Sequence, residues 1–537
     1  MPADRNKYIL AIDLGTSALK AALFTVDGKT VAWESEPLEV KLLPGGGAEQ
    51  DPEDWWRALV RTAKALLQKE AAVASHVVAV SCTGQWSGTV AVDRDGRHLR
   101  PAIIWMDSRG GPYIKQITAG PIEIAGYGIS RLWTWVRLTA GAPGHAGKDS
   151  LAHILYLKHE HPDIYGRTYK FLEPMDYLSL RLTGLFRASY DSISLHWATD
   201  NRDISNVVYH DRLLRLAGIE RDKLPDLNRA TDILGPVKPE IARELGLPED
   251  VQVVMGTPDV HSAAIGSGAV RDYESHLYIG TSSFLPCHLP FKKTDLFHNM
   301  ATLPSAIPNR YLLANDQESA GVCLTFLRDT YFSPQAEGAA PDQTGTGDAR
   351  PQNVYPMFDR IAEQVSAGSD KLIFTPWLYG ERTPVEDRTV RSGFFNQSLR
   401  TTRAHLVRAV LEGVAYNSRW LLGCVEKFTG RRMDPINMIG GGANSNLWCQ
   451  IHADVLGRTI RQVQDPVQAN ARGAAFLAAV ALGFLTFDDI PSRVQIAHTY
   501  QPNPAHRQIY DELFQEFLNI YKCNRKIYAR LNKGSDE

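Results

Sequence analysis

The chain has 537 residues, and its 58 lysines and arginines against 60 aspartates and glutamates give a formal net charge of −2. This balance argues against an electrostatic grip on nucleic acid or on an anionic membrane surface. Hydrophobic residues make up 44% and charged residues 22% of the chain, which excludes a disordered polymer and predicts several buried layers. At about 150 residues per domain the length allows three or four domains, and two large ones fit equally well.

The six cysteines are scattered without a C-x-x-C pair. This pattern indicates neither a disulfide framework nor a zinc site, and it suits a reducing compartment. The first residues lead into a strand-like run without the apolar centre of a signal peptide. The longest apolar stretch, residues 474–485, is shorter than the roughly 18 residues that a membrane span needs. We therefore expect a cytoplasmic protein.

Apolar runs rich in β-branched residues alternate with helical patterns along the first half of the chain. Residues 8–12 and 18–26 predict a pair of strands, and residues 77–81 predict a buried strand. Between them, Asp51 suits the N-cap of a helix and Pro52 suits its first position. Alternation of this kind predicts an α/β architecture.

The middle of the chain suggests a division into two parts. A Gly-rich helical pattern over residues 263–268 is followed by a new strand from residue 277. We place a domain boundary at residue 268, which gives domains 1–268 and 269–537. Residues 333–352 are rich in Pro, Gly, Ala, Gln and Thr and predict a surface loop, not a domain linker.

A short sequence recurs about half a chain apart. IDLGTS at 12–17 is partly repeated as YIGTSS at 278–283, and each copy has a strand, a Gly-Thr-Ser turn and a second strand. Alone, such a tripeptide is typical of an ordinary hairpin. The repeat predicts two domains of like topology, each presenting a turn of small residues to a shared cleft.

These turns suit phosphate chemistry. Glycine lets the backbone N–H groups approach phosphate oxygens, and Thr and Ser hydroxyls add donors. Asp13, beside the first turn, would supply charge for Mg²⁺, which prefers one or two carboxylates, waters and phosphate oxygens. An Asx-turn cap on its own hairpin is the simpler interpretation of Asp13 taken alone.

A second carboxylate lies in GTPDVH at 256–261, after a predicted strand and before a small-residue helix. Phosphoryl transfer to an alcohol requires one carboxylate that orients the hydroxyl and accepts its proton, and Asp259 is our candidate. A helix N-cap would use the same residue type.

The run GGGANSN at 440–446 stands between a predicted strand and a helix. Consecutive glycines at such a turn let a flat ring or a phosphate approach the backbone. The run has neither the G-x-G-x-x-G nor the G-x-x-x-x-G-K-[ST] spacing, so neither a Rossmann site nor a P-loop is predicted. A flexible turn is the alternative.

In these residues the chain resembles the FGGY carbohydrate kinases, and among them most closely the xylulose kinases. Each matching segment is short, but their order and spacing from about residue 8 to residue 485 are specific. The segments are residues 12–17, 49–52 with Trp55 and Trp56, 84–85, Trp105, Asp107, Arg109, 176–178, Asp259, 280–282, 380–384, 409–413 and 440–443.

The resemblance implies two actin-like (ribonuclease H-like) α/β domains around a central cleft. It implies ATP as donor, Mg²⁺ as cofactor, and transfer of the γ-phosphoryl group to a hydroxyl of a small sugar, a ketopentose such as xylulose or ribulose being the expected one. The N-terminal domain would bind sugar and the C-terminal domain nucleotide. We also consider a homodimer.

By the same resemblance, each candidate residue has an expected role. Asp259 would be the general base and Asp13 the metal residue. The phosphates would lie against Thr16, Ser17, Gly280, Thr281 and Ser282, the adenosine against Gly441, Gly442, Ala443 and Asn446, and the sugar against Gln85, Trp86, Ser87, Asp107, Val260 and His261.

The departures from the family pattern concentrate on the sugar side. Xylulose kinases carry Met-His where Trp86 and Ser87 stand, and Asn or Gln where Val260 stands. A lost hydrogen-bond partner changes which hydroxyl pattern is tolerated, because an unpaired buried group costs about 1–3 kcal/mol. The sequence therefore supports kinase activity better than it supports xylulose as the substrate. Further departures are His153 and Tyr156 for Lys and Trp, and Gln397 for Gly.

Several alternatives remain open at this point. Residues 126–138 have no family counterpart and form either a pocket lid or a packed surface insertion, and the 380–384 marker is structural if Arg382 forms an ion pair. A polyol or tetrose kinase is the runner-up, although glycerol kinases carry Arg-Glu in place of Trp86-Ser87. A nucleotide-binding actin-like module without turnover is the competitor from another class.

Overall fold

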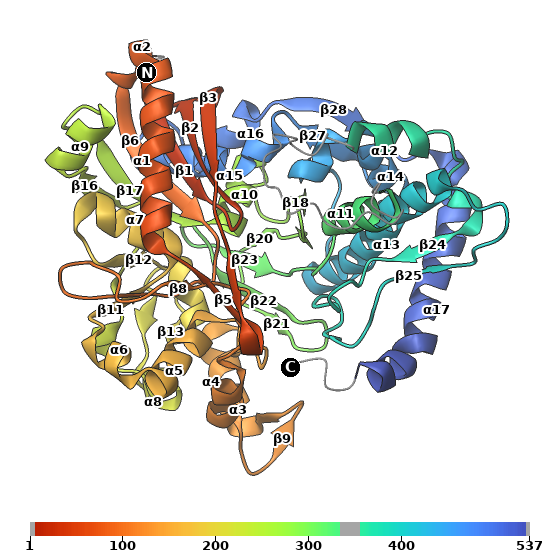
Figure 1. Ribbon diagram of the computed structural model, residues 1–537, viewed down its shortest axis with the longest axis horizontal. Helices are drawn as coiled ribbons and strands as arrows, with labels where there is room; N and C mark the ends of the chain where they lie inside the picture. Colours follow the sequence, from red (N-terminus) through yellow and green to blue (C-terminus); the bar gives the residue numbers. More distant parts are fainter. Residues whose placement is uncertain (1–5, 333–354, 533–537) are drawn as a thin grey trace, which may run out of the picture.

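The computed structural model describes residues 6–332 and 355–532 (Figure 1). The loop predicted at 333–352 lies outside the described residues. The main architecture is two mixed β-sheets, each in one half of the chain, with helices packed around them.

The first sheet has the strand order β16-β17-β6-β1-β2-β3. Its central strand, β1, is antiparallel to β2 and parallel to β6, so the predicted strand pair is confirmed. Its strands are β1 (Tyr8–Leu14), β2 (Ala18–Thr25), β3 (Thr30–Pro37), β6 (Val77–Gly84), β16 (Ile233–Pro236) and β17 (Gln252–Pro258). β1, β6 and β17 are almost fully buried, as apolar strands with covered faces should be.

The register of this sheet brings three chain segments to one edge. Leu14 lies opposite Gly84 in β6, and Gly84 lies opposite Pro258 in β17. Because these three strands are parallel, their carboxyl ends meet at the same edge. The turn after β1, the loop after β6 and Asp259 after β17 therefore start side by side.

Helix α1 (Pro52–Lys69) confirms the predicted capping. The Asp51 side chain accepts a hydrogen bond from the Glu53 N–H, and Pro52 occupies the first helical position. The remaining helices of this half are α2 (Ala71–Ala74), α3 (Gly111–Thr118), α4 (Ile129–Thr139), α5 (Ser150–Glu160), α6 (Pro162–Arg167), α7 (Pro174–Thr183), α8 (Asp211–Ala217), α9 (Pro239–Leu245) and α10 (Asp259–Gly266).

The second sheet has the order β19-β18-β26-β27-β28, with β18, β26 and β27 parallel. Its strands are β18 (Ser275–Ile279), β19 (Ser283–Phe284), β26 (Ile436–Ile439), β27 (Ile460–Val463) and β28 (Ile496–Tyr500). The turn after β18 is a hairpin, because Tyr278 pairs with Phe284 in β19. This hairpin repeats the β1–β2 arrangement, as the recurring sequence predicted.

Other elements complete the second half. A four-stranded sheet has the order β20-β23-β22-β21, from β20 (His288–Leu289), β21 (Thr294–Asp295), β22 (Met300–Pro304) and β23 (Tyr311–Ala314). The helices are α11 (Val322–Leu327), α12 (Tyr355–Ala362), α13 (Arg403–Thr429), α14 (Asn446–Leu456), α15 (Ala469–Ala481), α16 (Ile490–Arg493) and α17 (Arg507–Leu531).

Two crossing helices join the halves. The predicted 263–268 helix is α10, which begins four residues earlier, at Asp259, and ends at Gly266. It packs against α15, which comes from the second half of the chain yet shares a buried core with β1, β2 and β6 of the first sheet. A Cβ on Gly266 would lie 1.8 Å from the Ala469 carbonyl oxygen, and one on Gly473 would lie 1.9 Å from that of Ser262. Only glycine permits this approach.

The predicted boundary at residue 268 falls between the strands of the two sheets. The exact boundary remains a prediction, because α15 packs on the sheet of the other half.

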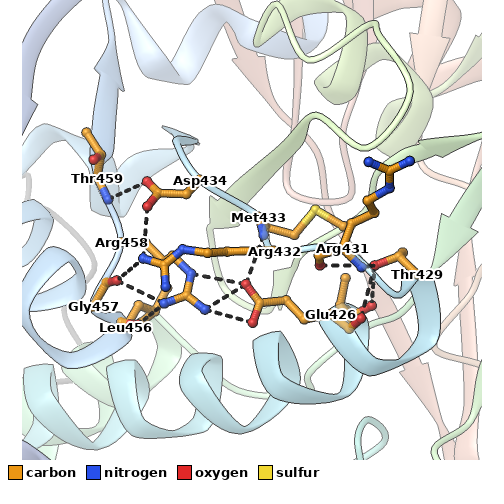
Figure 2. Close-up of polar contacts among 11 residues, drawn as sticks. Glu426, Thr429, Arg431, Arg432, Met433, Asp434, Leu456, Gly457, Arg458 and Thr459 are labelled. Carbon is orange, nitrogen blue, oxygen red and sulfur yellow. Dashed lines mark hydrogen bonds and ion pairs between the residues drawn. The ribbon is translucent and has the colours of Figure 1, made fainter.

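A charged corner fixes the starts of β26 and β27 at the edge opposite the Gly-rich loop. Figure 2 shows the Arg458 guanidinium donating to both carboxylate oxygens of Glu426 near the end of α13, at 2.7 Å. Glu426 also accepts the Met433 N–H, and Asp434 accepts the Thr459 N–H at 3.0 Å. One helix end and two strand starts are thereby tied together.

None of the described helices has the length and apolar composition that crossing a bilayer requires. All six cysteines are free thiols, as their scattered spacing predicted.

Candidate active site between the two domains

Asp259 is the first residue of α10 and directly follows β17. Its carboxylate accepts the Val260 N–H at 2.8 Å, and Pro258 occupies the N-cap position, so Asp259 is not the helix cap considered above. Burial, and then the neighbouring carboxylates of Asp13 and Asp316, raise the pKa of Asp259 to about 7. A carboxyl that titrates near neutral pH has the proton affinity that a general base requires.

Asp13 lies within β1 and is only 3% exposed. One carboxylate oxygen accepts from the Lys20 ammonium at 3.4 Å, while the other is buried without a hydrogen-bond partner among the described residues. The hydroxyl of Thr83, opposite it on β6, is likewise buried and unpartnered. Asp13 is therefore a strand residue with a free oxygen, not an Asx-turn cap, and that oxygen fits a Mg²⁺ ion or its water.

The first turn is held by both its backbone and its side chains. The Gly15 N–H donates to the Ala18 carbonyl at 3.0 Å, which closes the hairpin. The Thr16 hydroxyl accepts from the Trp105 indole at 2.9 Å, and its carbonyl accepts from the Gln50 amide at 2.8 Å. Ser17 is exposed at the tip. The structure thus anchors Thr16 to the surrounding loops and leaves Ser17 facing outward.

The second turn is likewise closed by a backbone hydrogen bond from its glycine, but over two residues instead of three. The Gly280 N–H donates to the Ser282 carbonyl at 2.9 Å, and Thr281 is exposed. The carbonyls of Gly280 and Thr281 accept from Gly321 and Ala320, both at 2.8 Å. These hydrogen bonds to the two carbonyls hold the turn in place and leave the exposed Thr281 side open to a ligand.

The Gly-rich loop lies beside this second turn. Gly440 has φ = +86°, and a Cβ there would lie 2.6 Å from the Ile279 carbonyl oxygen. Gly441 is exposed, with open space around its Cα, whereas a Cβ on Gly442 would lie 2.4 Å from the Ile279 side chain. Glycine is thus required where the loop approaches β18, and the exposed face stays flat.

Ala443 and Asn446, the last two residues predicted to contact adenosine, differ in their exposure to solvent. Ala443 is fully buried, and its carbonyl accepts from the Gln462 amide at 2.6 Å. Asn446 is exposed at the start of α14, with its amide oxygen accepting from the Tyr500 hydroxyl at 2.9 Å and from Gln462 at 3.2 Å. Both residues follow the Gly-rich loop, and the Asn446 amide oxygen is bonded toward β27 and β28, so their contact with adenosine stays a prediction.

The loop after β6 carries the predicted sugar residues. The Gln85 amide donates to Gln50 at 2.8 Å, and the Trp86 indole donates to the Ser192 carbonyl at 2.9 Å. Ser87 has φ = +64°, unusual for a residue with a Cβ, and its hydroxyl donates to the Lys148 carbonyl at 2.7 Å. Strain of this kind, held by specific bonds, is typical of functional loops.

His261 lies two residues after Asp259 in α10, and its ring contacts this loop. Its imidazole meets the Trp86 ring edge-on, with centroids 5.3 Å apart. It is fully buried, and neither ring nitrogen has a hydrogen-bond partner among the described residues. Burial lowers the pKa of His261 to about 3, so the ring is neutral. Val260, by contrast, is half-buried and offers no polar side chain.

Asp107 occupies a structural network. It is 1% exposed, and its oxygens accept from the Ala48 N–H at 2.9 Å and from three N–H groups of Arg109. Both oxygens therefore have partners without a sugar. A direct part for Asp107 in sugar binding stays a prediction.

Sequence reasoning missed a second group of charges near Asp259. Arg382 pairs with Asp316 at 2.5 Å and with Glu318 at 2.8 Å, which is the ion pair considered for the 380–384 marker. Lys148, from the first half of the chain, lies 3.8 Å from Glu318. Only Arg382 belonged to a motif. The acidic residues lie outside every motif, so no sequence signal indicated them.

Glu173 was also missed. It is fully buried below the loop after β6, where it accepts the Gly88 N–H at 3.0 Å and the Ser150 hydroxyl. Burial raises the pKa of Glu173 to about 8. A buried carboxyl bonded to the residue after Ser87 supports the unusual backbone of that loop.

Residues 126–138 include both exposed and buried side chains. Trp133 is 66% exposed, whereas Trp135 is fully buried and its indole donates to the Trp197 carbonyl at 3.2 Å. Tyr127, before α4, stacks on His145 with ring centroids 3.8 Å apart. The segment is thus packed at least on one side.

The fold and the site define a two-domain α/β protein with actin-like domains that transfers phosphoryl groups. Comparison with known proteins makes the class specific: the family model for the N-terminal domain of the FGGY family of carbohydrate kinases matches residues 8–266, and that for the C-terminal domain matches residues 277–482. The chain belongs to the FGGY family of carbohydrate kinases and is an ATP-dependent sugar kinase.

Relatives and solved structures cover the chain almost completely. The xylulose kinase of Staphylococcus epidermidis is 28% identical over 98% of this chain and 99% of its own, and the gluconokinase of Bacillus subtilis is 26% identical over 98% of each. The crystal structures of gluconate kinase and of ligand-bound xylulose kinase from Lactobacillus acidophilus superpose with TM-scores of 0.83 and 0.82, each at 25% identity. They cover 98% of this chain and 99% and 100% of theirs.

Proposed function

We propose that this kinase transfers the γ-phosphoryl group of ATP to a hydroxyl of a ketopentose such as xylulose or ribulose. The observation that carries the proposal is Asp259, a carboxylate at the converging strand ends whose pKa is raised to about 7 beside a second carboxylate, Asp13. The similarity to xylulose kinases over the whole chain supports the choice of sugar.

Asp259 acts on the acceptor. It accepts the proton of the sugar hydroxyl as that oxygen attacks the γ-phosphorus in line with the bond to the β–γ bridging oxygen. The P–O bond to the bridging oxygen breaks, and ADP leaves. The raised pKa supports this role, because a base needs a proton affinity close to the working pH.

Backbone turns hold the donor. The turns at Thr16–Ser17 and at 280–282 place N–H groups and hydroxyls at the phosphates, and Gly441 and Gly442 present a flat surface to adenosine, with Ala443 and Asn446 behind them. The free carboxylate oxygen of Asp13 fits a Mg²⁺ ion. Bound there with ATP, Mg²⁺ would neutralise phosphate charge.

Side chains of the loop after β6 read the acceptor. Trp86 and Ser87 replace Met-His, and the neutral His261 next to Trp86 has two free ring nitrogens. With Val260 unable to hydrogen-bond, we assign hydroxyl recognition near Asp259 to His261 and Gln85. The imidazole can accept or donate, according to its tautomer.

A gluconate kinase is the second candidate, because gluconokinases are similar to this chain over the same length. A polyol or tetrose kinase of the same family is a further alternative. The candidate from another class, an actin-like module that binds nucleotide without turnover, conflicts with the paired carboxylates of Asp13 and Asp259.

A screen of ATP consumption tests the choice. The full chain with MgATP is offered D-xylulose, D-ribulose, D-gluconate, D-erythrulose and erythritol, with Asp259→Asn as the matched blank. We expect a ketopentose to give the highest kcat/KM, with consumption reduced at least about 100-fold in Asp259→Asn. A higher kcat/KM with gluconate or a tetrose would replace the proposed substrate, and ATP binding without turnover on any acceptor would refute the sugar-kinase mechanism.

A further inference from the structure

A pocket of about 740 Å³ opens where the two halves of the chain meet behind the adenosine loop. The start of β3 and the end of α1 line it from the first half, and the segment from β27 to the start of α15 lines it from the second, together with β28, Asn444 and Asn446. Its volume is that of a small-molecule site. Asn446, which is expected at the adenosine, also belongs to the lining, so the pocket adjoins the proposed nucleotide site and extends beyond it to β3 and α1.

One buried side chain in the lining has no partner. Gln468 is 2% exposed, and neither its amide nitrogen nor its amide oxygen has a hydrogen-bond partner among the described residues. Leaving both groups of a buried amide unpaired destabilises the folded state. Folded proteins rarely keep such groups unless something else satisfies them.

Most of the lining is uncharged and suits a neutral hydroxylated molecule, although Glu70, Asp465 and His498 also belong to it. Trp33, on β3, is 46% exposed and belongs to the lining, as do the amides of Asn444 and Gln464. Amides both donate and accept, which matches sugar hydroxyls, and an indole face suits the apolar face of a sugar ring. Lys69, the one lysine or arginine among the described lining residues, is already paired with Glu34 at 3.2 Å. No lysine or arginine in this lining is therefore left for a phosphate.

The pocket lining is hydrogen-bonded to residues that are expected to contact the nucleotide. Gln462 belongs to it, and the Gln462 amide donates to the carbonyl of Ala443 and to Asn446, both expected at the adenosine. A molecule in the pocket would touch both halves of the chain and the support of the adenosine loop.

We propose that this pocket is a second, non-catalytic site for a neutral monosaccharide, which stacks on Trp33 and hydrogen-bonds to Gln468. The site is separate from the proposed acceptor site, so it does not depend on which sugar the enzyme phosphorylates.

Hydrogen–deuterium exchange of the full chain without ATP tests the site. The probes are D-xylulose, D-xylose, D-ribose and D-glucose, each at millimolar concentration, with adenosine as a separate arm. We expect at least one sugar to slow exchange in residues 30–33 and 462–468 by threefold or more. Protection at 85–88 would report the acceptor site instead, so the two proposals fail independently.

Two variants and a control localise the effect. Trp33→Ala and Gln468→Leu should each remove the protection at 30–33 and 462–468 and leave protection at 85–88 unchanged. Trp133→Ala, which removes another exposed tryptophan, should change neither. The proposal is overturned if none of the four sugars protects these segments, if only adenosine does, or if protection survives both substitutions.

Discussion

The two sides of the active site are built differently. On the proposed donor side, Ser17, Thr281 and Gly441 are exposed on short turns, two of which are closed by backbone bonds from Gly15 to Ala18 and from Gly280 to Ser282. On the acceptor side, the loop at 85–88 is held from distant parts of the chain by Gln50, Ser192 and Glu173. In the proposed function, phosphate would therefore meet exposed turns that short sequence motifs encode, whereas the sugar would meet side chains whose positions depend on long-range packing.

Substituting the proposed base, Asp259, should have the largest effect on activity. It should slow phosphoryl transfer without weakening ATP binding. Asp259→Asn keeps the size of the side chain but loses the proton acceptor, and we expect kcat to fall by about 10²–10⁴-fold. ATP affinity, measured by calorimetry, should remain within about threefold of the parent, since the donor turns are untouched. Transfer at the parental rate would show that Asp259 is not the base.

The pH dependence should report the same carboxyl. Asp259 must be deprotonated to act, and its pKa is raised to about 7, so kcat/KM should fall about tenfold for each pH unit below 7 and level off above it. Asp316→Asn removes a negative charge that helps to raise this pKa, so the acid limb should move to lower pH.

Comparing the two profiles under the same MgATP concentration cancels the titration of ATP itself. An acid limb in the same place in the parent and in Asp316→Asn would contradict the proximity of Asp316 to the base.

On the donor side, crowding a single glycine should raise the KM for ATP alone. A Cβ on Gly442 would lie 2.4 Å from the Ile279 side chain, so Gly442→Val must push the loop away, and we expect a rise of about tenfold or more. Gly423→Ala is the control, because Gly423 is an exposed glycine of α13, outside the proposed site, and its Cβ would enter open space. If both variants raise the KM equally, the loop does not depend on its contact with β18.

On the acceptor side, the corresponding test is Glu173. Glu173→Leu leaves the buried Gly88 N–H and Ser150 hydroxyl unpaired, which should cost about 1–3 kcal/mol of unfolding free energy and raise the sugar KM several-fold. Glu173→Gln keeps an acceptor oxygen and should restore much of the KM. A positioning role predicts this rescue with the KM for ATP constant, whereas a shift of both KM values would mean that Glu173 supports the whole domain.

The same contrast explains what the sequence could predict. The strand–turn repeat at Gly15 and Gly280, the helix cap at Asp51 and the Gly-rich loop are local patterns, and the structure has the predicted strands, cap and turn there. Glu173 and Asp316 reach the site from distant segments without a motif. Asp107 matched a family segment, but its bonds to Arg109 appear only when the fold is known.

The smallest effect on activity should come from the charged corner in Figure 2, although its effect on stability is measurable. Arg458→Met removes the cation that faces both oxygens of Glu426 and should lower the unfolding free energy by about 1–3 kcal/mol, measured by urea denaturation. Both KM values should stay unchanged, since this corner lies at the start of β26 and the adenosine loop follows its end. Arg432→Met, an exposed pair partner of Asp434, should cost less than about 1 kcal/mol. A raised KM for ATP in Arg458→Met would mean that the strand transmits strain from one end to the other, and the donor side would then depend on distant packing just as the acceptor side does.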